Sequence, residues 1–168
     1  KATIIAGRAS FMSSGGDIFE DMDENKTTTF NITPGISHFI TENFYVGGGI
    51  EIAAQSQGNS SYNAIGIGPH IGYMFGGTQS TALPFFDLGI DYYKMNMDYG
   101  AGEDSVFSGS NIALGLGVII PVKTHIGLVF EGGYNMMDLK DRDSNDTMSG
   151  NIFSIGIGIV GLLFQSEM

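Results

Sequence analysis

Residues 125–136 read His-Ile-Gly-Leu-Val-Phe-Glu-Gly-Gly-Tyr-Asn-Met, and this stretch decides the fold. Bulky apolar side chains occupy alternate positions at Ile126, Leu128 and Phe130, and the pattern resumes at Tyr134 and Met136. The other face carries Gly127, Val129, Glu131, Gly133 and Asn135, which are small or polar except for the valine. This period of two indicates a β-strand, because successive side chains of a strand point to opposite faces.

The same alternation recurs along the chain and predicts eight strands, each close to the 9–11 residues that a tilted strand needs to cross a membrane. An even number of strands places both chain ends on one side of a barrel. We therefore expect residues 1–168 to form one domain, an all-β, eight-stranded antiparallel up-and-down transmembrane β-barrel. The predicted strands are 3–12, 29–40, 44–52, 63–75, 86–93, 111–120, 125–136 and 153–160.

The two faces of these strands differ in a way that favours a membrane barrel over a soluble one. One face is continuous, bulky and nearly free of charge, and the other is mostly Gly, Ala, Ser and Asn. A soluble barrel needs a well-hydrated outer face, and the small-residue face would not supply one. The same face suits the interior of a narrow barrel. A soluble ligand-binding barrel remains the alternative. Aromatic residues near strand ends, among them Phe39, Phe85 and Tyr93, are interpreted as girdles at the membrane interfaces.

Composition excludes several classes of function. The net charge of −11 argues against nucleic acid as a partner, because such binding needs a basic face. The absence of cysteine excludes disulfides and thiolate metal sites. No apolar run is long enough to predict a transmembrane helix. The first residues carry no recognisable leader, so we expect the mature form of an exported protein.

The predicted connections alternate in length. Short turns are expected at 41–43 and 122–124, with a longer one at 76–83; the opposite side carries 13–27, 56–61, 99–105 and 138–147. Short periplasmic turns and longer outer loops are usual in such barrels, so we expect both termini in the periplasm. The outer loops are acidic, and their candidate residues are Asp17, Glu20, Asp21, Asp23, Glu24, Glu103, Asp104, Asp141, Asp143 and Asp146.

Several segments resemble the small outer-membrane β-barrel family of the OmpA/OmpX type. Residues 32–47 resemble its second and third strands, with a proline, an aromatic pair, a tight polar turn and a strand ending in glycine. Residues 66–75 and 84–93 are similar to the next two strands, and 154–164 to a terminal strand ending in phenylalanine. The resemblance implies a bacterial outer-membrane barrel and no specific activity. Phe164 breaks the alternation of its strand, which predicts a bulge near Val160–Gly161 or a swapped final face.

The candidate site is a polar network inside the barrel. An unpaired charge in so narrow a lumen is costly, so Arg8 is expected to bridge carboxylates and form a polar plug. A gated or leaky cation path is the functional alternative, and a catalytic carboxylate pair at Asp87 and Asp91 is the least favoured. We expect no enzyme activity and no cofactor. The network residues are Arg8, Glu51, His70, Asp87, Asp91 and Glu131.

Two loops show a calcium-like spacing of acids, starting at Asp21 and Asp141. An EF-hand needs glycine at the sixth position, where these loops have Lys26 and Asp146, so only weak divalent-cation binding is expected. The sequence thus predicts an outer-membrane protein with a structural or interaction role. Its partners would be membrane lipid and, as part of a larger complex, other envelope proteins. A narrow porin-like channel for small solutes or cations is the alternative.

Overall fold

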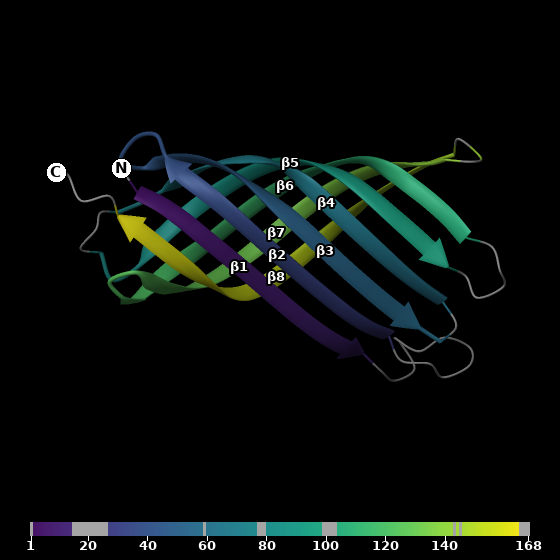
Figure 1. The fold of residues 1–168 in the computed structure, drawn as a ribbon, viewed down its shortest axis with the longest axis horizontal. Coiled ribbons are helices and arrows are strands. Elements are labelled where there is room, and N and C mark those ends of the chain that lie inside the picture. The colour runs from purple at the N-terminus through teal and green to yellow at the C-terminus, as the bar shows by residue number, and fades with distance from the viewer. Residues whose placement is uncertain are drawn as a thin grey trace.

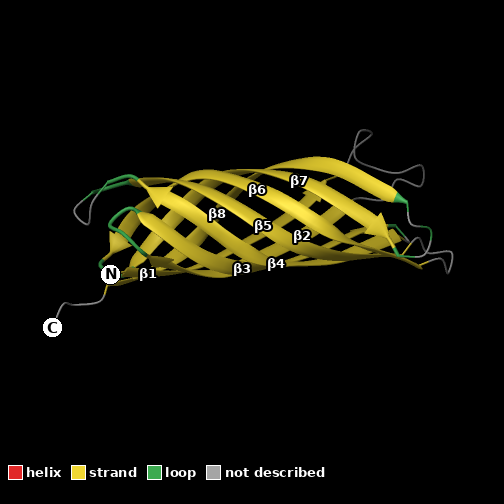
Figure 2. Ribbon diagram, turned by 90° about the horizontal axis from the view of Figure 1, so that it is seen from above, coloured by secondary structure: helices red, strands yellow, loops and turns green. Residues whose placement is uncertain are grey.

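The computed structural model describes residues 2–14, 27–58, 60–76, 80–98, 104–142, 144 and 146–164. Within them the chain forms eight antiparallel strands in one closed barrel, in which each strand pairs with its neighbours in sequence and the last pairs with the first (Figures 1 and 2). The strands are β1 Ala2–Ser14, β2 Thr27–Phe39, β3 Phe44–Gln57, β4 Ser60–Met74, β5 Leu83–Asp98, β6 Asp104–Lys123, β7 Ile126–Asp141 and β8 Thr147–Phe164. The predicted fold class is confirmed.

Both chain termini lie at the same end of the barrel (Figure 1). We call this the terminal end, where β1 begins and β8 finishes, and we call the other the loop end, where β1, β3, β5 and β7 finish. The β2–β3 turn at the terminal end is held by the hydroxyl of Thr41, which accepts hydrogen bonds from the backbone N–H groups of Asn43 and Phe44 at 3.4 and 3.0 Å. This turn was predicted at 41–43.

The outer face of the barrel is apolar on every strand. Isoleucines dominate it, and Ile36, Ile67 and Ile90 leave more than half of their surface exposed. Each lies one residue away from an inward-facing glycine or small side chain, as the alternation predicts. Such a surface is stable in contact with lipid and prone to aggregation in water. Among the described residues, no helix is long and apolar enough to span a membrane.

The strands extend further at the loop end than the hydrophobic alternation indicated. Asp138, which was predicted in a loop, lies within β7, and the predicted 56–61 loop shrinks to the two residues between β3 and β4. At the terminal end, the turn predicted at 122–124 begins only after Lys123. Hydrophobic alternation stops where the apolar band ends, whereas the backbone ladder continues beyond it because it needs no particular side chain.

The bulge predicted near Val160–Gly161 is wrong. Pairing of β8 is regular through that region, both with β7, where Gly161 faces Ile126, and with β1, where Phe164 faces Ala2. The register shift lies instead in β6, between Pro121 and Lys123. Pro121 has no backbone N–H to donate, which makes an irregular ladder there inexpensive.

Candidate functional site: a polar chamber in the barrel

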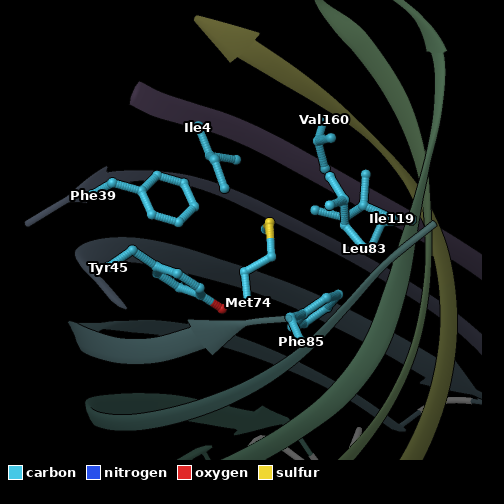
Figure 3. Packing of buried hydrophobic residues seen from close by; sticks show 9 residues of the cluster. Ile4, Phe39, Tyr45, Met74, Leu83, Phe85, Ile119 and Val160 are labelled. Atoms are coloured by element: carbon cyan, nitrogen blue, oxygen red, sulfur yellow. The ribbon is translucent and has the colours of Figure 1, made fainter. Parts of the chain in front are cut away.

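The terminal end of the lumen is filled by a cluster of buried apolar side chains, which we call the floor (Figure 3). All eight strands contribute to it, so the floor spans the whole cross-section of the barrel. Its phenylalanines correct the girdle prediction, because Phe39 and Phe85 point into the lumen and are only 8% exposed. The floor consists of Ile4, Phe39, Tyr45, Met74, Leu83, Phe85, Ile119, Val129 and Val160.

Large floor residues are accommodated by glycines on neighbouring strands. A Cβ added at Gly72 would collide with the ring of Tyr45, and one added at Gly117 would collide with the ring of Phe85. The abundant inward glycines therefore do more than line a narrow lumen: they leave the space that inward aromatic rings occupy. Interior packing of this kind is dense enough that a single added methyl group is felt.

Above the floor lies a layer of polar side chains. The Ser37 hydroxyl and His70 Nε2 are 2.7 Å apart in a hydrogen bond that joins β2 to β4. The His70 ring also meets the edge of the Tyr45 ring, with centroids 6.2 Å apart. The Asn31 amide donates to Glu51 Oε1 at 2.6 Å, which joins β2 to β3. These contacts satisfy polar groups that would otherwise be costly to bury.

A second polar set centres on Asn111 of β6, which is 1% exposed. Its amide nitrogen donates to Asp91 Oδ2 at 3.2 Å and to Asn135 Oδ1 at 3.1 Å, linking β5, β6 and β7. Within the part of the chain that the structure describes, its own Oδ1 is buried without a hydrogen-bond partner. An orphaned buried acceptor is uncommon in proteins.

Five of the six predicted network residues line one internal cavity of about 270 Å³: Glu51, His70, Asp87, Asp91 and Glu131. Gly115 lies between two of the carboxylate residues. A Cβ added at Gly115 would lie 3.3 Å from Glu131 Oε1 and 3.4 Å from Asp87 Cβ. The sixth residue, Arg8, stands on β1 opposite Thr33 and Gly158. Its side chain lies outside the described part of the structure, so its bridging role stays a prediction.

The neutral partners of this chamber were not selected from the sequence. Asn31, Ser37, Asn111 and Asn135 carry no charge, and their place on the small-residue face was the only signal for them. A third layer closes part of the loop end, and we call it the loop-end cluster. It consists of Ala53, Ala64, Tyr93, Phe107 and Leu139, with Tyr62, Met95, Met97 and Met137 packed against them. Tyr93, predicted as an interface aromatic, is thus inside the barrel.

The acidic loop candidates are described only in part. Asp17, Glu20, Asp21, Asp23, Glu24, Glu103 and Asp143 lie outside the described residues, and Asp104 begins β6 with its side chain undescribed. Asp141 ends β7, where its carboxylate accepts from the Ser144 N–H at 3.0 Å, and the Asp141 N–H donates to the Asp146 carbonyl at 2.8 Å. These bonds give the acid at 141 a turn-forming role. Among the described side chains, no group of three or more His, Asp or Glu is arranged to hold a metal.

A family model, described as outer membrane protein beta-barrel domain, matches residues 51–160. That segment covers more than half of the chain, and the chain belongs to this family. It is therefore a β-barrel protein of the bacterial outer membrane, set in the lipid of that membrane. No curated protein matches the chain.

The fold is similar to those of several solved outer-membrane proteins. OprG from Pseudomonas aeruginosa is 14% identical with a TM-score of 0.66, and the match covers 98% of this chain and 96% of that one. Neisserial surface protein A is 18% identical with a TM-score of 0.59, over 95% of this chain and 94% of that one. The N-terminal barrel of OprF from Pseudomonas aeruginosa is 10% identical with a TM-score of 0.54, over 96% of each chain. At these identities the likeness shows the fold alone.

Proposed function

We propose that this protein is a non-enzymatic barrel whose lumen is closed and whose acidic loop end serves interactions at the cell surface. One observation carries the closed lumen: all eight strands send a buried apolar side chain into the floor. The termini would lie in the periplasm and the loop end outside, the usual orientation of single-chain bacterial barrels. The whole chain would act as one domain.

The interaction role is supported by charge at the loop end. Asp146 is exposed there, beside the turn that Asp141 and Ser144 organise. The chain as a whole has a net charge of −11. An acidic surface attracts cations, so weakly held divalent ions would bridge it to anionic lipid headgroups or to acidic patches of other envelope proteins.

Planar-bilayer conductance tests the closed lumen. We expect the wild-type protein to give no steady channels. Phe85→Ala removes a floor ring and should produce measurable conductance. Phe86→Ala is the matched control, because Phe86 is the next residue on β5 and lies on the outer face. Equal conductance of the two variants would contradict the role given to the floor.

A narrow cation channel is the second candidate, favoured by the carboxylates that line the cavity. It predicts steady cation-selective channels in the wild-type protein that disappear in Glu131→Ala or Asp91→Ala. That result would support the channel and overturn the closed lumen.

The loop end can be tested with vesicles of anionic lipid and Ca²⁺. We expect detergent-solubilised protein to bind such vesicles only when Ca²⁺ is present. The triple variant Asp141→Asn, Asp143→Asn, Asp146→Asn should bind more weakly, since asparagine keeps the turn but removes charge. Glu42→Gln, an exposed acid in the turn at the terminal end, is the control. An equal loss of vesicle binding in the triple variant and in Glu42→Gln would contradict a special role for the loop end.

A further inference from the structure

The seam between β1 and β8 is paired over only part of its length. Within the described strands, the ladder ends where Arg8 lies opposite Gly158, although β1 continues to Ser14. On its other edge β8 pairs with β7 as far as Thr147. Residues 147–157 of β8 therefore have a neighbouring strand on one edge only, and we call their unpaired side the free edge.

Part of the free edge lies in the lipid-facing band. Phe153, Ile155 and Ile157 continue the apolar outer face of β8. Lipid offers no hydrogen-bond partner to backbone N–H and C=O groups, so an unpaired ladder at this depth is costly. An extended polypeptide can pair with such an edge residue by residue and become an additional strand of the sheet. The edge thus defines the backbone conformation of the partner that it would take.

The outer side chains of β8 lack cover on this side. Ile155 is 79% exposed and Phe153 is 72% exposed, the highest values among the large apolar residues. Ile52 of β3 is 45% exposed, and it has paired residues on both sides, Ile32 and Ile65. Side chains at paired positions cover one another across a ladder. One flank of Ile155 is therefore free to receive an apolar neighbour.

Inward glycines elsewhere in the barrel make room for side chains of a neighbouring strand. An added Cβ at Gly66 would collide with the ring of Tyr93. One at Gly117 would collide with the ring of Phe85. A large inward ring beside an inward glycine is thus a repeated packing unit of this barrel.

Two inward glycines of β8 depart from this unit. At Gly150 and Gly156 an added Cβ would meet no described atom within 4 Å, whereas every other inward glycine whose surroundings the structure defines has an atom of a neighbouring strand within that distance. Ile152 stands between them, faces inward and is still 51% exposed. Both spaces lie beside the free edge, where a paired strand would supply the missing side chains.

We propose that the free edge of β8 is a docking site for one extended strand of a partner polypeptide. The partner pairs its backbone with residues 147–157 and turns apolar side chains to the lipid beside Phe153 and Ile155. Its inward side chains are bulky, and aromatic rings fill the spaces over Gly150 and Gly156.

A complete second barrel does not meet these requirements. Two barrels that stand upright in one membrane have tilted strands, which cross at the contact instead of running side by side. The partner is therefore a single strand whose apolar and aromatic residues alternate. The inference goes beyond the proposed surface role of the loop end and leaves the closed floor in place.

The test uses a fluorescent peptide of about ten residues, the length of one membrane-spanning strand, in which phenylalanine alternates with isoleucine. Fluorescence anisotropy follows its titration with the full chain in neutral detergent, and we expect saturable binding. A second peptide has the same side chains and is N-methylated along its backbone. It should bind at least about tenfold more weakly, because its amides cannot donate to the ladder. Absence of saturable binding, or equal binding of the two peptides, would overturn the proposal.

Gly156→Phe fills one of the two spaces from the β8 side and should weaken binding of the first peptide about tenfold, since the peptide ring can no longer enter. Gly48→Phe is the control, because a Cβ there meets only the Gly68 carbonyl, at 3.4 Å, on the outer face of β3 and away from the seam. Unchanged binding in folded Gly156→Phe protein would overturn the place given to the rings.

Cross-linking locates the peptide without altering a glycine. A peptide with cysteine at a central isoleucine position should form a disulfide with Ile155→Cys and not with Ile36→Cys, an exposed position on the outer face of β2. Equal cross-linking at the two positions would overturn the docking site. A dimer of Ile155→Cys protein, formed without saturable binding of the peptide, would overturn the proposal in favour of a second barrel on this edge.

Discussion

The two ends of the barrel are closed to different degrees. At the terminal end all eight strands contribute to the floor, and every seam is paired. At the loop end the described members of the buried cluster come only from β3 to β7, and the β1–β8 seam is unpaired. On β8 the inward positions at this height are Gly150, Ile152, Ser154 and Gly156, too small or too exposed to reach the cluster. Sealing so narrow a lumen therefore depends on every strand presenting a large inward side chain.

Removing a floor ring should have the largest effect on stability. Phe85→Ala leaves a cavity among the floor residues and should lower the free energy of unfolding by about 3–5 kcal/mol. Phe86→Ala, at an outer position, should cost much less because no interior cavity forms. Urea unfolding in lipid vesicles, followed by gel mobility, measures both. Similar losses of unfolding free energy in Phe85→Ala and Phe86→Ala would mean that the floor is not packed as a core.

Glycine substitutions separate the closed region from the open one. Gly72→Ala would press on the Tyr45 ring, which floor neighbours hold in place, and should cost about 1–3 kcal/mol. Gly156→Ala adds the same methyl group into open space and should be close to neutral. The same unfolding assay compares them. A neutral Gly72→Ala would contradict tight packing at the floor.

The polar layer should contribute least. Asn111→Ala removes the hydrogen bonds to Asp91 and Asn135 but also removes an orphaned acceptor, so we expect a loss of about 1 kcal/mol. Asn96→Ala, at an exposed position of β5, is the control and should change stability little. A loss from Asn111→Ala as large as that from Phe85→Ala would make the polar layer, not the floor, the main internal support.

Hydrophobic alternation was enough to predict the number of strands and the residues that face inward. It brought Glu51, His70, Asp87, Asp91 and Glu131 to one face, and the structure places them around one cavity. Alternation says nothing of how far a backbone ladder runs, so the strand ends and the unpaired seam were missed.

The aromatic misassignments have a related cause. Phe39, Phe85 and Tyr93 stand near strand ends, where girdle residues are also found, and position along a strand does not distinguish the two. These three residues fall on the same alternate positions as the inward-facing residues of their strands, and this distinguishes them from girdle residues. The glycines that leave room for these rings lie on neighbouring strands, as Gly117 does beside Phe85. The sequence alone does not show which residues of two strands lie side by side.

Disulfide formation across the seam tests the difference between the two ends most directly. The chain has no cysteine, so introduced pairs are unambiguous. Ile5→Cys with Gly161→Cys joins residues that are paired, whereas Phe11→Cys with Ile155→Cys joins positions that would face each other if the same register continued. A disulfide needs Cα atoms about 4.4–6.8 Å apart. We predict that the first pair oxidises readily and the second stays reduced. Equal oxidation of both pairs would show that the seam is closed along its whole length and would contradict the account.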